Sequence, residues 1–320
     1  MRLGCWTPLY SKEEGVENPF QFAVDELHKA EDQGFDMALV AERWAGPWLE
    51  AWVLSAALAA ATKKIELITA VHPGVLNPQV VAKMAASIDL ISGGRCAVNI
   101  VGGWQQKELE IYGNGGWLED EHARHKRMEE FLHVLKGLWT EEQFSFEGDF
   151  YAVASHSPPI NTVSVPHPRI YAVGHSEEGR DVVAKYGDVW FIDAPPNHRR
   201  FEQNFAAIER DVKSMNGRSG GHNCRVECYL NGTVLLADSL EIALGRADDL
   251  ELSAKGNRQR SVPGGIRGLG LGLVGPPALV ADRMRRYQDV GIAGFMLRFF
   301  PLRTGRELFS RSVMPHLTRH

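Results

Sequence analysis

Short apolar runs alternate with helical patterns along nearly the whole chain, and this alternation constrains the fold more than any other feature of the sequence. The segments between the runs repeat apolar residues at helical spacing, as residues 120–139 do. Eight runs are predicted to be strands: Arg2–Trp6, Met37–Ala41, Ile65–Val71, Cys96–Val101, Arg169–Val173, Val189–Ile192, Val226–Leu236 and Gly294–Arg298. Eight β/α units in 320 residues predict an α/β fold of the (β/α)8 TIM-barrel class. A doubly wound open sheet is the alternative.

One segment departs from the alternation. Residues 246–272 contain the polar run Asn257–Arg260, then Pro263-Gly264-Gly265 and three more glycines. This composition is typical of a mobile loop, and a long loop inside a compact barrel is usually functional or disordered. We predict a lid inserted before the last β/α unit, in a single barrel domain spanning residues 1–320. A partly helical, solvated excursion is the alternative.

Charge and cysteine usage narrow the classes of partner. The formal net charge of −5, without a long basic run, argues against a nucleic-acid or membrane partner. No apolar run approaches the ~20 residues of a membrane span, and the N-terminal residues lack the features of a secretory signal. Cys224 and Cys228 have no matching second pair, so we expect no metal site. A cytoplasmic protein fits these features.

The residues that follow each strand of a β/α barrel gather at one rim, where active sites form. This rim set has no carboxylate pair, no metal-ligand cluster and no Ser-His-Asp order. A rim without a strong nucleophile or metal indicates that a bound cofactor supplies the chemistry. The set is Thr7, Tyr10, Glu42, Arg43, Trp44, His72, Asn99, Trp104, Glu108, Gly174, His175, Ser176, Asp193, Asn197, Asn231, Thr233 and Arg298.

Asn99 is the one polar residue in the apolar strand Cys96–Val101, which two glycines and Trp104 follow. A buried amide must find hydrogen-bond partners or cost about 1–3 kcal/mol. Gly102 and Gly103 allow another group to approach the backbone closely. The stretch therefore suggests the floor of a ligand site, or else a core strand whose Asn99 caps a neighbouring loop.

Gly174, His175 and Ser176 lie between a predicted strand and the helix that starts near Glu177. Backbone N–H groups at a helix N-terminus and a serine hydroxyl suit a phosphate, although glycine and serine also start helices routinely. Arg124 and His125, near the start of the long helix, could face a phosphate or lie on a solvated face. No Gly-x-Gly-x-x-Gly fingerprint follows any of the early strands, and no P-loop pattern is present.

Several of these segments together resemble a known family. The stretch Ser92–Trp104 closely resembles the flavin-dependent luciferase-like monooxygenases, in particular the dimethyl sulfone and alkanesulfonate monooxygenases and pyrimidine oxygenase. Weaker matches extend the resemblance over nearly the whole chain: Ala85–Asp89, Gly148–Tyr151, Gly174–Ser176 and Leu273–Pro276. The resemblance implies a (β/α)8 barrel that binds reduced FMN (FMNH2), supplied by a separate NAD(P)H-dependent flavin reductase. It also implies that the flavin reacts with O2 through a flavin peroxide, and that the protein is a homo-oligomer.

Site roles follow from the resemblance by position. The implied catalytic residues are Asn99, Asn231 and Trp104, and no metal ligand is implied. The implied cofactor-binding residues are Glu42, Arg43, Ala70, Asn99, Glu108, Arg124, His125, Gly174, His175 and Ser176. His125 departs from the family, which usually has tyrosine there, and an imidazole changes charge near neutral pH.

The substrate is less constrained than the cofactor. The sulfonate enzymes place an arginine and a histidine where this chain has Asn231 and Thr233, and a tyrosine where it has Phe300. Asn231 matches the amide of the sulfone type, which favours a small neutral or weakly polar substrate. The class that the resemblance implies is an organosulfur compound such as a sulfone or sulfonate, or an amide or heterocycle. Arg298 and Arg267 could restore positive charge or could simply be solvated. The alternatives are a deazaflavin (F420)-dependent oxidoreductase on the same barrel and a non-catalytic flavin-binding protein.

Overall fold

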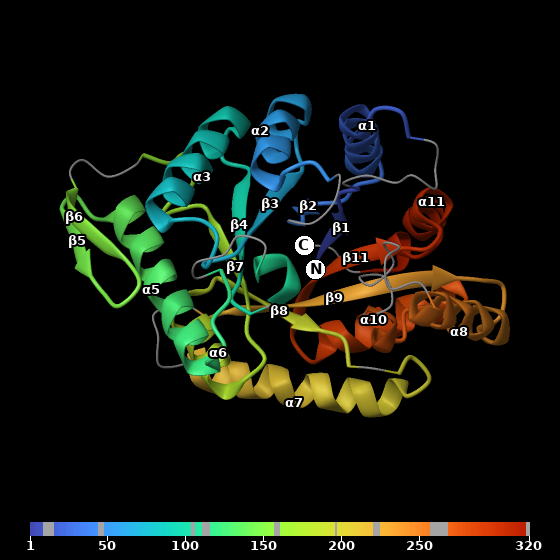
Figure 1. Ribbon diagram of the computed structural model, residues 1–320. Coiled ribbons are helices and arrows are strands. Elements are labelled where there is room, and N and C mark those ends of the chain that lie inside the picture. The colour runs from blue at the N-terminus through green and yellow to red at the C-terminus, as the bar shows by residue number, and fades with distance from the viewer. Residues whose placement is uncertain are drawn as a thin grey trace.

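The chain forms a closed barrel of eight parallel strands with helices on its outside (Figure 1). The computed structural model describes residues 1–8, 16–43, 48–103, 106–110, 116–156, 161–195, 197–219, 225–256 and 268–317. The barrel strands are β1 (Arg2–Trp6), β2 (Met37–Val40), β3 (Glu66–Val71), β4 (Cys96–Val101), β7 (Arg169–Val173), β8 (Val189–Asp193), β9 (Glu227–Leu236) and β11 (Ile292–Phe299). All eight lie within two residues of the predicted bounds, which confirms the (β/α)8 class.

The barrel closes because β8 pairs with both β7 and β9, while β11 pairs with both β9 and β1. The short strand β10 (Val274–Gly275) adds to β9 outside the barrel. A separate antiparallel pair, β5 (Phe144–Glu147) and β6 (Ala152–His156), forms a hairpin outside the barrel sheet. The open doubly wound sheet is therefore wrong, since that fold leaves two unpaired edges.

Helices connect the strands and pack around them. They are α1 (Pro19–Asp32), α2 (Ala51–Ala61), α3 (Pro78–Ser92), α4 (Gln106–Leu109), α5 (Glu121–Thr140), α6 (Glu177–Tyr186), α7 (Phe201–Ser219), α8 (Leu240–Gly256), α10 (Pro277–Asp289) and α11 (Leu302–Ser312), with 3-10 turns η2 (Gly268–Leu271) and η3 (Met314–His316). Local signals set several ends: Asn18, Asp120 and Ser176 accept hydrogen bonds from the first turns of α1, α5 and α6. Gly93 ends α3 in the left-handed conformation, at φ 69°.

Side chains of each strand alternate between the barrel interior and the layer under the helices. In β4, Ala97 joins the interior cluster, whereas Val98 and Ile100 pack in the outer layer. Asn99 therefore faces the interior. At the amino end of the barrel, Arg2 pairs with Glu66 (3.0 Å), which accepts a hydrogen bond from the Tyr171 hydroxyl (2.6 Å). Since sites of such barrels lie at the other end, we assign this network to stability.

The lid predicted over residues 246–272 is partly wrong. Residues 246–256 complete helix α8, and residues 268–271 form the buried turn η2. Two carboxylates of α8 hold His198: Glu251 lies 2.9 Å from Nδ1, and Asp248 lies 3.2 Å from Nε2. The partly helical alternative is closer to the structure at both ends. Residues 257–267 lie outside the described residues, so a lid there stays a prediction.

Candidate active site

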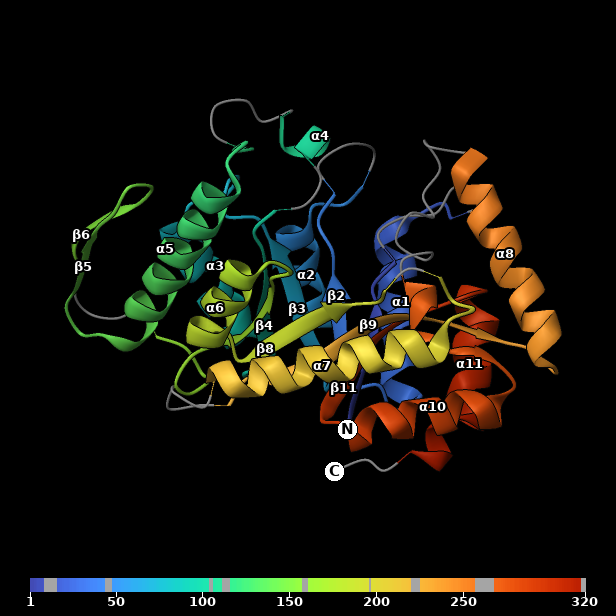
Figure 2. The same cartoon turned by 90° about the horizontal axis from the view of Figure 1, so that it is seen from below.

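The carboxyl ends of the strands meet at one end of the barrel, where helix α4 follows β4 (Figure 2). Strand alternation directs one ring of side chains into this mouth: Trp6, Leu39, Ala70, Asn99, Val173, Asp193, Asn231 and Arg298. One half of the ring is apolar apart from Asn99. The other half contains Asp193, Asn231, Arg298 and Trp6, which are charged, amide and aromatic groups. The mouth therefore has an apolar side and a polar side.

Asn99 lies between Ala70 of β3 and Tyr171 of β7 in strand register. The Asn99 side chain is buried, and its Oδ1 accepts no hydrogen bond from the described residues. Among the described residues, no loop donates a hydrogen bond to Asn99 Oδ1, so the loop-capping alternative has no support from that atom. Because a buried carbonyl without a partner costs about 1–3 kcal/mol, a ligand or water that donates to Oδ1 would remove this cost. Ala70 next to it has a small side chain, which leaves room at this side of the mouth.

His72 lies two residues beyond Ala70, on the same side of the chain. Its Nδ1 accepts a hydrogen bond from the Gly74 N–H (3.1 Å), so Nε2 carries the proton. Burial, with Arg127 as a lesser cause, lowers the pKa of His72 to about 3, so the imidazole is neutral at physiological pH. Nε2 has no partner among the described residues. The sequence placed His72 at the rim without assigning it a role. Its Nε2–H is a second buried polar group near β3 without a hydrogen-bond partner among the described residues.

Asn231 is the centre of the polar side. Its Oδ1 accepts hydrogen bonds from Trp6 Nε1 and from Arg298, each at 3.2 Å. The Arg298 guanidinium lies over the Trp6 ring, 3.3 Å from its centroid. Since both donors approach Oδ1, the amide nitrogen is directed to the other side, where Asp193 Oδ1 lies 3.5 Å away. Asn231 therefore presents a donor to the mouth.

His175 extends the polar side toward β7. Its Nε2 lies 3.5 Å from Asp193 Oδ2, and the ring is largely exposed. The imidazole thus contacts a carboxylate, while the His175 backbone belongs to the turn before α6.

The turn between β7 and α6 forms the predicted phosphate end. Ser176 is the N-cap of α6: its Oγ accepts a hydrogen bond from Gly179 N–H (3.2 Å) and lies 2.7 Å from His125 Nε2. The close packing requires glycine, since a Cβ on Gly174 would lie 2.5 Å from Gly179 O, and one on Gly179 would lie 2.9 Å from His125 Cε1. The backbone N–H groups and the Ser176 hydroxyl at the N-terminus of α6, with the His125 imidazole of α5 beside them, form a set of groups that fits an anion.

Arg124 and His125 diverge, although the sequence predicted them as a pair. The Arg124 guanidinium lies 4.4 Å from the centre of the Trp117 ring and donates to the carbonyls of Leu118 and Glu119 (2.5 and 2.9 Å). A Cβ on Gly103 would lie 3.4 Å from Arg124 Nε, so the side chain lies beside the end of β4. Among the described contacts, His125 reaches Ser176 and Arg124 holds residues 117–119.

Glu42 and Arg43 follow β2, where the resemblance places flavin contacts. Glu42 accepts backbone hydrogen bonds from Arg43 (2.7 Å) and Ala51 (2.9 Å), so its carboxylate holds the loop against the start of α2. Burial, together with the neighbouring Glu50, raises the pKa of Glu42 to about 7. The Arg43 guanidinium lies 5.7 Å from the centre of the Trp48 ring. Trp44, Trp104 and Tyr10 lie outside the described residues, as does the side chain of Glu108.

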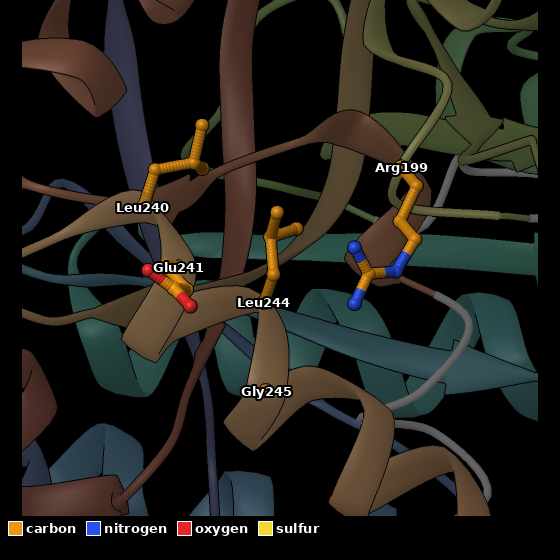
Figure 3. Close-up of a pocket in the computed structure, with 5 residues that line it drawn as sticks. All are labelled: Arg199, Leu240, Glu241, Leu244 and Gly245. Atoms are coloured by element: carbon orange, nitrogen blue, oxygen red, sulfur yellow. The ribbon is translucent and has the colours of Figure 1, made fainter.

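A surface pocket lies apart from the mouth, between the start of α8 and the residues before α7. Its lining includes none of the predicted site residues: Arg199, Leu240, Glu241, Leu244 and Gly245 (Figure 3). Among the described residues, no three His, Cys, Asp or Glu side chains are grouped to hold a metal ion. In the same part of the chain, no helix has the length and apolar character to cross a membrane.

Comparison with known proteins decides between the families that such a barrel could represent. The family model for luciferase-like monooxygenases matches residues 1–294. The chain belongs to this family. A curated relative of this luciferase-like monooxygenase is the FMNH2-dependent dimethylsulfone monooxygenase of Pseudomonas putida. The two are 29% identical over 317 residues, which cover 89% of this chain and 85% of the relative.

Solved structures agree on the fold. EDTA monooxygenase from Chelativorans sp. BNC1 has a TM-score of 0.78 at 18% identity, covering 98% of this chain and 92% of that one. An F420-dependent secondary alcohol dehydrogenase has a TM-score of 0.70 at 18% identity, covering 99% of both chains. At such identities the likeness shows the shared barrel alone. The family membership makes this protein an enzyme of the flavin-dependent monooxygenase type, and its substrate follows from none of these comparisons.

Proposed function

We propose that this luciferase-like monooxygenase is the oxygenase of a two-component system. It takes reduced FMN from an NAD(P)H-dependent flavin reductase and uses O2 to oxygenate a small organic molecule. The observation that carries this proposal is the buried Asn99 Oδ1, left without a donor beside Ala70 on the mouth wall. Bound reduced FMN would supply the electrons that activate O2.

Each side of the mouth has a role in this proposal. Asn99 accepts a hydrogen bond from the isoalloxazine edge, with Ala70 leaving space for the ring. The Ser176 hydroxyl and the backbone N–H groups of His175 and Ser176 hold the phosphate, and His125 contacts Ser176. Asn231 and Trp6 face the substrate, and Trp6 also excludes water from the reacting atoms. Glu108, Glu42, Arg43 and Arg124 stay predicted flavin contacts, and Trp104 stays a predicted catalytic residue, on the resemblance alone.

The polar side favours a neutral substrate with acceptor oxygens. Asn231 presents its amide nitrogen, a donor, to the mouth. Asp193 and Arg298 flank this amide with opposite charges, so the two together add no net positive charge to attract a sulfonate. A sulfone or an amide places neutral oxygen acceptors against such a donor, and the Pseudomonas putida relative is named for dimethylsulfone. We therefore propose a neutral sulfone or amide as the substrate class.

An F420-dependent oxidoreductase is the second candidate, because a dehydrogenase that uses F420 shares the barrel. The two candidates differ in their need for O2. We would supply reduced FMN or reduced F420 and measure O2 consumption and coupled product with sulfones, sulfonates, amides and heterocycles. Coupled product with reduced FMN alone supports the proposal, whereas O2-independent turnover with reduced F420 overturns it. Failure to bind reduced FMN in an anaerobic fluorescence titration would indicate the non-catalytic alternative or a different cofactor.

We also propose that the protein is a homo-oligomer that buries the outer face of α2 and α3, which lie side by side (Figure 1). Helix α2 has no charged residue, and its outward positions are alanines and Val53. Of the eleven strongly exposed large apolar side chains among the described residues, four lie on these two helices: Val53, Val80, Leu90 and Ile91. Small α2 residues and larger α3 residues on one face suit a second copy of the chain, since a two-fold axis sets one against the other.

A further inference from the structure

His72 is a buried imidazole to which the proposed function gives no role. It directly follows β3 and continues the period-two spacing of Ile68 and Ala70, whose side chains face the barrel interior. His72 is 6% exposed, and its Nε2 has no hydrogen-bond partner among the described residues. The spacing therefore directs His72 toward the mouth, on the strand that pairs with the strand of Asn99.

The one ring hydrogen of His72 is on Nε2. Nδ1 accepts a hydrogen bond from the Gly74 N–H (3.1 Å), so the neutral imidazole carries its hydrogen on the other nitrogen. Burial, with the Arg127 charge as a lesser cause, lowers the pKa of His72 to about 3, so Nδ1 stays an acceptor at physiological pH. His72 thus offers a single N–H donor in a fixed tautomer, and a buried donor without an acceptor is costly for folding.

The turn that carries His72 is held by contacts from outside the barrel strands. The Tyr151 hydroxyl, in the β5–β6 turn, donates to the Pro73 carbonyl. Gly74 packs closely on Arg127 of α5, since a Cβ at that position would lie 2.5 Å from Arg127 Nη2. With the bond from Gly74 to Nδ1, these contacts fix both the backbone and the ring of His72. A donor held in one position by its surroundings is how proteins preorganise a ligand contact.

Asn99 and His72 present opposite hydrogen-bonding atoms on neighbouring strands. Among the described residues, Asn99 Oδ1 is a buried acceptor without a donor, and His72 Nε2–H is a buried donor without an acceptor. Ala70, the register partner of Asn99, lies two residues before His72 and has a small side chain. A ligand that satisfies both atoms needs an N–H and a carbonyl close together on one edge. The isoalloxazine ring has N–H and carbonyl groups side by side.

We propose that His72 is a ligand of the flavin ring: its Nε2–H donates a hydrogen bond to an isoalloxazine carbonyl oxygen, next to the ring N–H that donates to Asn99. This inference rests on the proposed function, since it places the isoalloxazine in the mouth. Near neutral pH, reduced flavin carries a negative charge that the ring shares with its carbonyl oxygens. A hydrogen bond to a charged acceptor is stronger than one to a neutral acceptor, so His72 favours reduced over oxidised FMN.

Anaerobic fluorescence titrations with oxidised and reduced FMN test this preference. His72→Phe keeps a ring but removes the donor, so we expect about tenfold weaker binding of reduced FMN and less than about threefold weaker binding of oxidised FMN. His72→Gln has an amide oxygen for the Gly74 N–H and an amide nitrogen for the flavin, and should restore most of the loss. His167→Phe is the matched control, because His167 stacks on Trp139 before the amino end of β7 and should leave both affinities unchanged.

Lumiflavin separates the ring from the phosphate. It has the isoalloxazine without the phosphate chain, so His72→Phe should weaken the binding of reduced lumiflavin by the same factor as that of reduced FMN. A loss confined to FMN would place His72 against the phosphate chain and overturn the inference.

Carbon NMR of bound FMN, labelled at its two carbonyl carbons, tests the contact itself. A hydrogen bond to a carbonyl oxygen moves the carbon signal downfield, so His72→Phe should move one signal upfield and His72→Gln should return it. If His72→Phe unfolds, which thermal unfolding would reveal, the wild type provides the test: both signals at the positions of flavin in an apolar solvent overturn the inference. Unchanged signals and affinities in folded His72→Phe overturn it and leave the proposed function standing, whereas no FMN binding by the wild type overturns both.

Discussion

Ala70 of β3 and Asn99 of β4 are register partners that face the barrel interior, and the Asn99 carbonyl between β3 and β7 has no donor among the described residues. A wall with a small apolar side chain beside an unsatisfied amide is costly for folding alone. The same wall suits a flat heterocycle that brings its own N–H. Strained or unsatisfied positions of this kind are expected where a protein gives up stability for a function.

Replacing Asn99 should separate the cost of its unsatisfied carbonyl to folding from its role in oxygenation. Asn99→Ala removes the unsatisfied carbonyl, so we expect the free energy of unfolding to stay equal or to rise by up to about 1 kcal/mol, while coupled oxygenation is lost. Thermal unfolding and product assays measure the two quantities. Thr69→Ala is the matched control on the outer side of β3, where Thr69 donates to Ser55 (2.7 Å). It should lower stability and leave oxygenation per folded enzyme unchanged. Oxygenation by Asn99→Ala at the wild-type rate would contradict the role of Asn99.

Asn231 should affect the substrate and not the flavin. In Asn231→Leu, Trp6 and Arg298 lose their shared acceptor and the mouth loses a donor. We expect KM for the substrate to rise about tenfold or more, with FMN affinity unchanged, and stability to fall by about 1–3 kcal/mol. Steady-state kinetics and FMN titration measure these effects. In Asn216→Leu, which removes the acceptor of Arg225 near the C-terminal end of α7, KM and FMN affinity should both stay at the wild-type values.

The Ser176 hydroxyl should contribute to FMN affinity through the phosphate. Ser176→Ala is expected to weaken FMN binding by about 1–2 kcal/mol, through a lost charge-assisted hydrogen bond, and to leave riboflavin binding unchanged. Ser239→Ala is matched to it, because the Ser239 hydroxyl also accepts a first-turn hydrogen bond, from Ile242 N–H at the start of α8. Equal FMN affinity of Ser176→Ala and the wild type would move the phosphate to another part of the chain.

Glu42 makes stability depend on pH. Burial beside Glu50 raises the pKa of Glu42 from 4.5 to about 7, so between these values the folded protein keeps a proton that the unfolded chain has released. The Glu42 contribution to stability therefore decreases as pH rises through this range. Urea unfolding at pH 5 and pH 8 should show a smaller decrease for Glu42→Gln than for the wild type. The exposed Glu17→Gln serves as the control and should follow the wild type; an identical pH dependence in Glu42→Gln would refute the assignment.

Charge on the outer face of α3 should disrupt the proposed oligomer. We expect Leu90→Glu to lower the sedimentation mass of the protein at micromolar concentration, because the carboxylate would be buried without a partner at the interface. Leu252→Glu, on α8, alters a side chain of similar exposure, 65% against 58%, and should leave the mass unchanged. A wild type that sediments as a monomer would contradict the proposal outright.

The strands and several site residues could be predicted because their signals are local. Apolar runs of strand length between helical patterns marked all eight barrel strands to within two residues. Ser176 as a helix start, Gly93 as a helix end and Asn99 as a polar residue in an apolar strand are likewise visible in short windows of sequence. The excess of glycine and charge in residues 246–272 was misleading, since contacts of α8 with His198 and Arg199 hold residues 246–256 in a helix. Tertiary contacts of this kind override local propensity.

The sequence by itself determined which residues are strands, which are helix ends and which polar groups reach the rim. Only the tertiary structure decided which of them meet. Asn231 contacts both Trp6 and Arg298 because their strands β9, β1 and β11 are neighbours in the closed barrel. Arg124 points away from His125 because its guanidinium packs on the Trp117 ring. Closure and register depend on the fit of all eight strands and their helices at once. A short window of sequence indicates whether a segment forms a helix or a strand, but it does not indicate which other element that segment packs against.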